Sequence, residues 1–330
     1  MKVLITGSSG FIGSNLLQYF IEKKEFELSI LLRKNSVSKK IQDVIEYRCD
    51  FFDIDSMKEA VSGKDIIIHI AGVTKVRNYN DFFKYNTEAT KNLLNAVKEF
   101  NPDLKRFIYF SSLSAAGPSK IDNPVDENTP ENPVSFYGKS KLQAEKIVKN
   151  SGIEYTIIRP PAVYGPGDKD IYIYFNLISK GIAPVLGSGK NQLSIVHVSD
   201  LVKGVYLVIN RLENSINKIF YFSDGKIYNW LRLREYLKNI INPKFCIDIK
   251  VPLFLLKPFS LLGDITNKIK KSPTPLNSDK FIEMEQEAWI CSIENAIKIL
   301  DFSADFDIFN GFKETYEWYL KNGWIKTKER

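Results

Sequence analysis

The start of the chain combines a short β-branched run, a glycine-rich turn and a helix-forming segment. Val3–Ile5 is apolar enough for a buried strand, and Phe11–Lys23 has apolar residues at helical spacing. Between them, Gly7, Gly10 and Gly13 recur every third residue. Glycines at such positions permit a tight turn and a close approach of backbone to a ligand. This unit predicts an α/β sheet that begins with a phosphate-binding turn.

The same alternation of strand and helix continues through the first half of the chain. The further strands are expected at Leu28–Leu32, Val44–Arg48, Asp65–Ile70, Arg106–Phe110 and Tyr155–Ile158. The further helices are expected at Asp55–Val61, Asp81–Phe100 and Ser135–Asn150. Because strands that alternate with helices are joined by right-handed crossovers, the pattern predicts a parallel sheet with helices on both faces.

The sequence pattern changes in Arg159–Asp170, which is rich in Pro, Gly and Asp and is typical of a loop. Later elements are shorter, namely a helix at Val205–Ile209, a strand at Ile219–Phe222 and a final helix at Asp307–Lys321. We therefore expect a cofactor domain at residues 1–165 and a smaller mixed α/β substrate domain at residues 166–330. Residues 190–225 could partly return to the first domain.

Charge and rare residues limit the partners that we expect. The 46 Lys and Arg residues exceed the 39 Asp and Glu residues by seven and are scattered, so no nucleic-acid partner is expected. Three separated cysteines and two histidines do not indicate a metal site. The N-terminal residues lack the apolar stretch of a secretion signal, which favours a cytoplasmic location.

The most apolar later segment is Val251–Gly263 (VPLFLLKPFSLLG). It is too short to span a bilayer and contains Lys257 and Pro258, so no stable membrane insertion is expected. We interpret it as a helix that covers a core or a substrate pocket. Contact with a membrane surface is the alternative.

Residues at the strand ends suggest how a dinucleotide is held. The glycine turn and the following helix N-terminus predict a pyrophosphate site made by Thr6, Gly7, Gly10, Phe11, Ile12 and Gly13. Arg33 follows the second strand, where NAD sites usually carry an acidic residue. Its guanidinium suits the additional phosphate of NADP, so NADP is favoured over NAD, although Arg33 could also be an ordinary exposed charge. After the next two strands, Asp50 could bind the adenine, and Ala71 and Gly72 are small enough for close passage; both features are also compatible with ordinary turns.

The catalytic candidates are Ser112, Tyr137 and Lys141. Tyr137 and Lys141 lie four residues apart on one helix face, and an ammonium group near a phenol lowers its pKa from the usual value of about 10. Ser112 follows the strand Arg106–Phe110, and ligands of open parallel sheets bind beyond such strand ends. A Tyr–Lys pair or a Ser-rich turn can each occur by chance, but their order along this fold favours catalysis.

These motifs resemble the extended short-chain dehydrogenases/reductases, the NAD-dependent epimerase/dehydratase family, over nearly the whole chain. The family pattern TGxxGxxG matches Thr6–Gly13, YxxxK matches Tyr137–Lys141, and the Ser five residues before a Gly matches Ser112. The resemblance implies a Rossmann-type doubly wound sheet with a smaller C-terminal substrate domain. It also implies that Tyr137 is the general acid/base, that Lys141 binds the nicotinamide ribose and tunes Tyr137, and that Ser112 orients the substrate oxygen.

The resemblance implies further features of the site and the assembly. It extends the cofactor-binding set to Phe51, Asn86, Ser111, Tyr137, Lys141, Pro160 and Val163. His197, in the segment Ile195–Asp200, is expected to be structural. A homodimer is expected through the helices Asp81–Phe100 and Ser135–Asn150.

The branch of the family is harder to predict. Ala116 stands where nucleotide-sugar epimerases usually have Tyr, and Gly187–Val196 lacks an Arg that often binds the nucleotide diphosphate. The chain looks closer to 3β-hydroxysteroid dehydrogenases and dihydroflavonol reductases, which also tend to carry Arg at the position of Arg33. We expect an NAD(P)-dependent dehydrogenase or reductase that transfers hydride at a hydroxyl or carbonyl carbon. The alternatives are a nucleotide-sugar epimerase or dehydratase with tightly bound cofactor, and a non-catalytic NADP-sensing protein.

Overall fold

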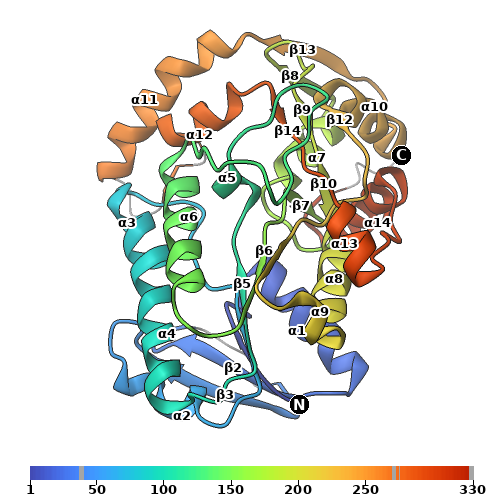
Figure 1. The fold of residues 1–330 in the computed structure, drawn as a ribbon. Coiled ribbons are helices and arrows are strands. Elements are labelled where there is room, and N and C mark those ends of the chain that lie inside the picture. Colours follow the sequence, from blue (N-terminus) through green and yellow to red (C-terminus); the bar gives the residue numbers. More distant parts are fainter. Residues whose placement is uncertain (37–40, 270–272, 275, 327–330) are drawn as a thin grey trace.

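The computed structural model describes residues 1–36, 41–269, 273–274 and 276–326, and it is built around one seven-stranded sheet (Figure 1). All neighbouring strands of this sheet are parallel, in the order β11-β6-β5-β4-β1-β2-β3. The strands are β1 (Lys2–Thr6), β2 (Glu27–Arg33), β3 (Val44–Cys49), β4 (Ile66–His69), β5 (Arg106–Phe110), β6 (Tyr155–Ile158) and β11 (Lys218–Phe220). The order reverses direction between β1 and β4, which confirms the doubly wound α/β fold.

Helices cover both faces of the sheet because its central strands are apolar on both sides. In β1, Val3 and Ile5 face one core and Leu4 faces the other. The first core is closed by α1 (Phe11–Lys23), α8 (Val198–Asn210) and α13 (Glu294–Leu300). The second is closed by α2 (Lys58–Val61), after the short 3-10 helix Asp55–Met57, and by α4 (Ala89–Phe100) and α6 (Phe136–Lys149).

The helix expected at Asp81–Phe100 is not a continuous α-helix. It consists of α3 (Asn80–Phe82), a π-helical segment at Phe83–Glu88, and α4. Within the π segment, Asn86 and Thr87 are buried and bond to Ser140 of α6. π turns inside helices occur frequently at functional sites, and this one turns two polar side chains toward the helix that carries Tyr137.

Short strands and aromatic helices form a second layer beyond the carboxyl ends of the main sheet. The strands are β7 (Ala162–Tyr164), β8 (Ile182–Leu186), β9 (Gln192–Leu193), β10 (Ile195–His197), β12 (Tyr228–Asn229), β13 (Ile247–Val251) and β14 (Ala288–Trp289). The helices are α5 (Leu113–Ala116), α7 (Tyr172–Ser179), α10 (Trp230–Ile241), α11 (Leu253–Ile269), α12 (Ser278–Met284) and α14 (Ile308–Lys321). The short helix α9 (Leu212–Ser215) lies instead at the amino ends of β5 and β6, where Ser215 bonds to Arg106 and Thr156. Rings of α7 and α14 pack edge to face, as in the pair Phe175 and Phe312, and give this layer its own core.

Residues beyond position 165 also build the main sheet. The edge strand β11 pairs with β6, and α8 and α13 pack on the first core. The segments β11, α8 and α13 therefore pack with the first domain although they follow residue 165. The border between residues 1–165 and 166–330 stays a prediction. The expected strand Ile219–Phe222 corresponds to β11, and the expected helix Val205–Ile209 is the second half of α8.

The apolar segment Val251–Gly263 leaves several large apolar side chains exposed, and its interpretation as a cover for a core or a pocket stays a prediction. Its helix, α11, continues through Pro258 to Ile269 and lies on the outside of the molecule (Figure 1). The side that packs on the protein carries the half-buried Leu253 and Leu256 together with small or polar residues, including Ser260 and Asn267, which are buried. The other large apolar residues of the helix point outward. In the part of the chain that the structure describes, no helix is long and apolar enough to cross a membrane.

Candidate active site

The glycine turn after β1 brings two backbone segments into direct contact. Gly7 has φ of +77°, and a Cβ atom there would lie 2.6 Å from the backbone nitrogen of Ala71. A Cβ atom on Gly13 would lie 2.2 Å from the carbonyl oxygen of Gly7. Gly10 precedes the first residue of α1 and donates to the same carbonyl at 3.0 Å. The turn needs glycine for backbone conformation and for space, and it leaves the N-terminus of α1 open to an anionic group.

A chain of hydrogen bonds beneath this turn involves His69, which the sequence analysis did not select. Thr6 Oγ1 lies 2.7 Å from His69 Nδ1 and accepts from the Ala71 amide at 3.1 Å. His69 Nε2 lies 3.0 Å from Thr90 Oγ1 of α4. Complete burial lowers the pKa of His69 to about 3, so the ring is neutral at physiological pH. The sequence signal that could have identified this histidine is its position as a polar residue near the end of the apolar run Asp65–Ile70.

Arg33 and Asp50 lie side by side at neighbouring strand ends. In the sheet register Arg33 pairs with Cys49, so Asp50 follows directly beside it. Both side chains are exposed, and the Asp50 carboxylate accepts from the Phe52 amide at 3.0 Å. Phe51 is buried, with its ring centroid 6.2 Å from that of His69. The structure thus gathers these three predicted residues at the carboxyl edge of β2 and β3.

Asn86 fixes the loop after β4 next to the Lys141 ammonium group. Its Oδ1 accepts from the Val73 amide at 2.7 Å, and its Nδ2 donates to the Val73 carbonyl at 3.1 Å. A Cβ atom on Gly72 would lie 2.8 Å from Asn86 Oδ1 and 3.8 Å from Lys141 Nζ. The small residues at this strand end therefore keep a path open beside Lys141.

Ser112, Tyr137 and Lys141 meet at the carboxyl end of β5. Ser112 caps α5, where its Oγ accepts from the Ser114 amide at 3.1 Å, and the Ser112 hydroxyl is near enough to the Tyr137 side chain to act on its pKa. Tyr137 lies in the first turn of α6. One turn later, Lys141 Nζ donates to the carbonyl of Phe110, the last residue of β5. The spacing argument for one shared helix face agrees with this arrangement.

The pKa of Tyr137 moves in the direction opposite to the one expected from a neighbouring ammonium group. Burial raises it to about 12, and the neighbouring Ser112 hydroxyl opposes this effect. Burial also lowers the pKa of Lys141 to about 7, against the attraction of Glu145. Burial outweighs the charge effects at both groups, so in the protein alone the phenol is protonated at neutral pH.

Ser111 and the loop after β6 complete the predicted cofactor set. Ser111 is buried, and within the described ranges its hydroxyl oxygen has no hydrogen-bond partner. Pro160 accepts from the Leu113 amide at 2.9 Å, and Val163 belongs to β7. An unsatisfied buried hydroxyl beside Ser112, together with the space that Gly7 and Gly13 leave, fits a dinucleotide with its reactive ring at the end of β5.

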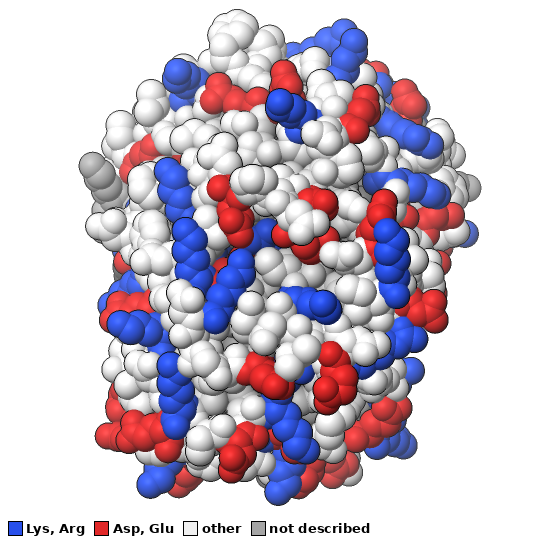
Figure 2. Space-filling model, in the orientation of Figure 1, with Lys and Arg blue, Asp and Glu red and all other residues white. Residues whose placement is uncertain are grey.

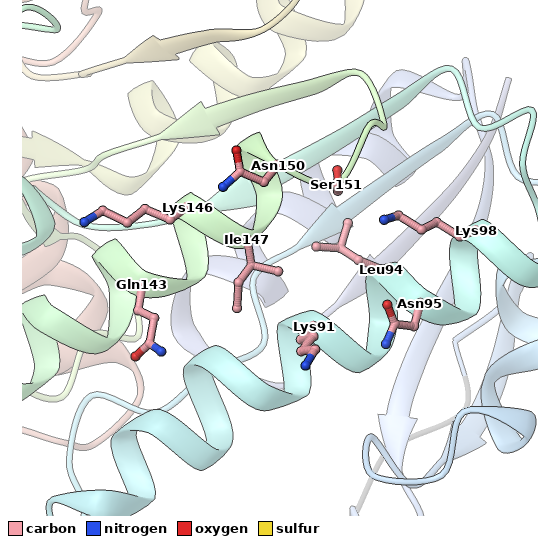
Figure 3. Close-up of a pocket in the computed structure, with 9 residues that line it drawn as sticks. All are labelled: Lys91, Leu94, Asn95, Lys98, Gln143, Lys146, Ile147, Asn150 and Ser151. Atoms are coloured by element: carbon pink, nitrogen blue, oxygen red, sulfur yellow. The ribbon is translucent and has the colours of Figure 1, made fainter.

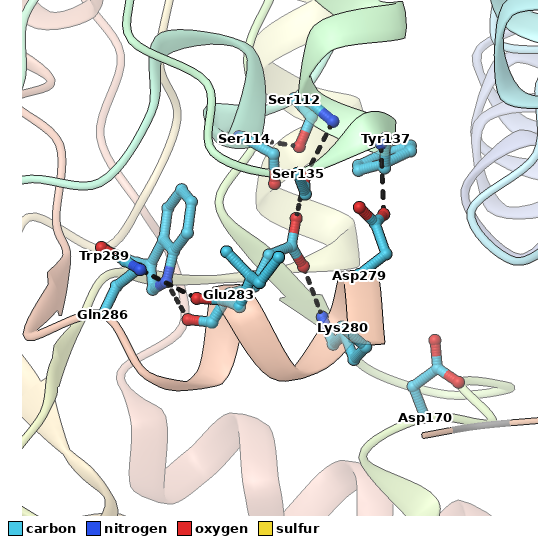
Figure 4. A network of polar contacts seen from close by, with 12 residues as sticks. Ser112, Ser114, Ser135, Tyr137, Asp170, Asp279, Lys280, Glu283, Gln286 and Trp289 are labelled. Atoms are coloured by element: carbon cyan, nitrogen blue, oxygen red, sulfur yellow. Dashed lines mark hydrogen bonds and ion pairs between the residues drawn. The ribbon is translucent and has the colours of Figure 1, made fainter. Parts of the chain in front are cut away.

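Helix α12 supports the start of α6 in a way that sequence analysis missed (Figure 4). The Asp279 carboxylate accepts from the Phe136 amide at 2.5 Å and from the Tyr137 amide at 3.3 Å. Ser135, the cap of α6, donates its hydroxyl to Glu283 at 2.8 Å. A carboxylate at a helix N-terminus satisfies free N–H groups and the helix dipole. More than a hundred residues separate the partners, so no local pattern revealed them.

Further charged or titratable residues lie inside the scaffold, among them Arg159 and His197. Arg159 is fully buried and binds Glu145 of α6 at 2.7 Å, which fastens α6 to β6. His197 is buried at the start of α8, 3.2 Å from Glu314, and burial lowers its pKa to about 4. Over the described ranges, no group of His, Cys, Asp and Glu residues is arranged to hold a metal ion.

Comparison with known proteins identifies the family. The model of the NAD dependent epimerase/dehydratase family matches residues 3–229. A UDP-glucose 4-epimerase of Vibrio cholerae is 26% identical over 97% of this chain and 96% of the relative. A ceramide reductase of Caulobacter vibrioides is 25% identical over 98% of this chain and 96% of the relative. The crystal structure of UDP-glucuronic acid 4-epimerase from Bacillus cereus with UDP-glucuronic acid and NAD has a TM-score of 0.77 at 19% identity, covering 98% of this chain and 100% of that one. The chain belongs to the NAD-dependent epimerase/dehydratase family and is an NAD(P)-dependent enzyme.

Proposed function

We propose that this enzyme interconverts a hydroxyl and a carbonyl group on its substrate, with Tyr137 as the general acid/base. The observation that carries this proposal is the meeting of Ser112, Tyr137 and Lys141 at the end of β5, beside the glycine turn. A bound nicotinamide dinucleotide supplies the hydride acceptor or donor. The cradle formed by Gly7 and Gly13 and the free hydroxyl of Ser111 are suited to hold it.

The side chains of the site divide the remaining work. Ser112 donates to the substrate oxygen and holds it against the Tyr137 hydroxyl, which gives or takes the proton. The buried Lys141 has a pKa of about 7, so it can carry its charge when a proton must leave Tyr137. Asp279 holds the amide of Tyr137 and so fixes the start of α6 as the phenol exchanges its proton. Ser112 and Tyr137 touch the substrate in this proposal, whereas Asp279 acts as a positioning residue.

Substitution of Tyr137 by Phe tests the proposal. It removes the exchanging hydroxyl and retains the ring, so kcat should fall by about 10²–10⁴-fold while the dissociation constant of the cofactor stays within about twofold. Turnover would be followed with a panel of hydroxy and keto compounds, and cofactor affinity by nicotinamide fluorescence. Tyr85→Phe, on the π segment, is the matched control and should change neither value. An unimpaired Tyr137→Phe enzyme would contradict the proposal, and retained cofactor binding without any turnover in the native enzyme would favour the NADP-sensing alternative.

The preference for NADP over NAD rests on Arg33 and is part of the proposal. Its side chain is exposed beside Asp50, at the strand end where the adenosine ribose of a dinucleotide lies in this fold class. Arg33→Ala should weaken NADP binding by about tenfold or more and leave NAD binding unchanged, because only NADP carries the additional phosphate. Titration of both cofactors measures this, and equal NAD affinity in the native enzyme would remove the preference.

A nucleotide-sugar epimerase or dehydratase is the second candidate, and the UDP-sugars bound in similar solved structures favour it. Such an enzyme regenerates its cofactor within each cycle. Incubation with UDP-glucose or UDP-glucuronic acid should then give an isomer or a dehydrated sugar without net change in nicotinamide absorbance. Net consumption of NAD(P)H with a keto substrate would instead support the dehydrogenase or reductase.

We also propose that the enzyme forms a homodimer through α4 and α6. A groove of about 310 Å³ lies between these helices, with Leu94 and Ile147 near its middle and lysines along its length (Figure 3). Ile147→Asp should convert dimers to monomers in light scattering, because it places a charge in the contact. Ile297→Asp, at an exposed position on α13, is the control and should leave the mass unchanged.

A further inference from the structure

Helix α11 turns its apolar side away from the protein. Phe254, Phe259 and Ile269 are 71%, 61% and 79% exposed, and the same side also carries Leu255, Leu261, Leu262 and Ile265 as exposed residues. These positions recur at helical spacing, so they form one continuous stripe. Soluble monomers rarely display such a stripe unless something covers it.

The inner side of α11 prevents the helix from rolling over to bury this stripe. A Cβ atom on Gly263 would lie 2.0 Å from the carbonyl oxygen of Leu276, so no larger residue can take its place. Asp264, the only acidic residue of the helix, accepts hydrogen bonds from the Tyr79 hydroxyl and from Ser278. The Asn267 carbonyl accepts from Arg77 Nε at 2.9 Å. The outward direction of the apolar stripe is therefore fixed by specific contacts.

Charge distinguishes among the possible partners of the stripe. Its exposed side carries Lys257 and no acidic residue, because Asp264 is turned inward. Lys250 of the preceding strand is also exposed. An apolar stripe flanked by lysines is complementary to an anionic lipid surface, and helices of this kind lie in the plane of the bilayer interface without crossing it. On the face shown in Figure 2, both signs of charge are mixed.

We propose that α11 docks this enzyme on the surface of anionic lipid bilayers, with Phe254 and Phe259 inserted among the acyl chains. The helix lies beyond the carboxyl ends of the sheet strands, against α12 (Figure 1). Docking there presents the active-site end of the molecule to the membrane. This inference does not depend on the chemistry proposed above, because it concerns a surface outside the catalytic residues.

Vesicle binding tests the proposal with the full-length enzyme. The native protein should cosediment with vesicles of phosphatidylcholine mixed with phosphatidylglycerol and bind pure phosphatidylcholine more weakly. The double variant Phe254→Ser and Phe259→Ser should bind the mixed vesicles at least about tenfold more weakly, because it removes the two large apolar side chains that insert among the acyl chains. Lys257→Glu should weaken binding severalfold on mixed vesicles only.

Controls keep the test decisive. The first control is the double variant Ile45→Ser and Ile297→Ser, which removes two apolar side chains outside α11 that are 51% and 49% exposed. The second control, Lys2→Glu, reverses a charge far from α11. Both should bind vesicles like the native protein. All variants should retain the native melting temperature and cofactor affinity, which reports folding separately from docking. Failure of the native protein to bind mixed vesicles, or undiminished binding by the Phe254 and Phe259 variant, would overturn the proposal. Self-association that this variant abolishes, without vesicle binding, would assign the stripe to a second copy of the chain.

Discussion

Helices α1 and α11 are both amphipathic, yet they present their apolar sides in opposite directions. In α1, Leu16, Leu17 and Phe20 face the sheet and are buried. In α11, Phe254 and Phe259 face outward, and the fully buried positions include the polar Ser260 and Asn267. Each helix also brings a glycine against a backbone carbonyl, Gly13 in α1 and Gly263 in α11. The comparison teaches that spacing reveals an apolar side but does not reveal what covers it.

The largest expected difference between the two helices concerns stability. Leu16→Ala leaves a cavity in a closed core and should lower the free energy of unfolding by about 2–5 kcal/mol. Phe254→Ala removes a larger side chain but should change it by less than about 0.5 kcal/mol, because that side chain is mostly exposed in the folded protein. Urea denaturation measures both. A comparable loss for Phe254→Ala would mean that α11 packs more closely than described.

Substitution of Gly13 or Gly263 by valine should affect different properties, cofactor binding in the first case and stability in the second. Gly13→Val forces the glycine turn apart and should weaken cofactor binding by about tenfold or more, since overpacking costs about 1–3 kcal/mol. Gly263→Val meets a similar obstruction at Leu276 and should lower the melting temperature without changing cofactor affinity. Cofactor titration and thermal unfolding of both variants distinguish the effects. Equal cofactor affinity in the Gly13→Val enzyme would contradict the predicted pyrophosphate site.

Acidification should destabilise the buried scaffold around the site. The folded pKa values of His69 and His197 are about 3 and about 4, below the ordinary value of 6.5. The unfolded chain therefore binds more protons than the folded one below pH 6.5, and stability falls as the pH drops from there toward 4. At pH 5.5 each histidine should cost about 1 kcal/mol relative to neutral pH. Denaturation of the His69→Gln variant should show a shallower pH dependence than the native protein, and an unchanged slope would exclude His69 as a source.

The smallest expected effect concerns the contact between α12 and α6. Asp279→Asn removes a charge from the N-terminus of α6 but retains an amide oxygen, so kcat should fall severalfold, in keeping with about 0.3–1 kcal/mol for such a charge. The cofactor dissociation constant should not change. A positioning role also predicts a shifted kcat–pH profile, because the Tyr137 amide loses a charged partner. An altered cofactor affinity with an unchanged profile would indicate a merely structural contact.

Local features allowed much of the fold to be predicted. The helix Phe11–Lys23 and the strand Tyr155–Ile158 occur at the predicted residues, because their patterns and ends are set by neighbouring residues. The positions of Ser112, Tyr137 and Lys141 at one strand end also agreed with the prediction, since helix spacing and sheet topology fix them; their roles stay proposals. Features that depend on distant partners were not predictable.

The features that were not predicted all depend on residues that lie far apart in the sequence and meet only in the folded protein. Asp279 reaches the amide of Tyr137 only after the chain has folded back. The outward side of α11 depends on the close fit of Gly263 against Leu276. The pKa of Tyr137 is dominated by burial, a property of the whole neighbourhood that the Tyr–Lys spacing does not contain.

The π-helical segment at Phe83–Glu88 accommodates wider turns within one helical rod. The rod therefore changes its angular phase between α3, whose Phe82 ring packs near Tyr137, and α4, whose Leu93 lies in the sheet core. One half of the rod contacts Tyr137, and the other half packs against the sheet. A substitution beside Tyr137 on the first half can therefore leave the sheet packing of the second half as it is.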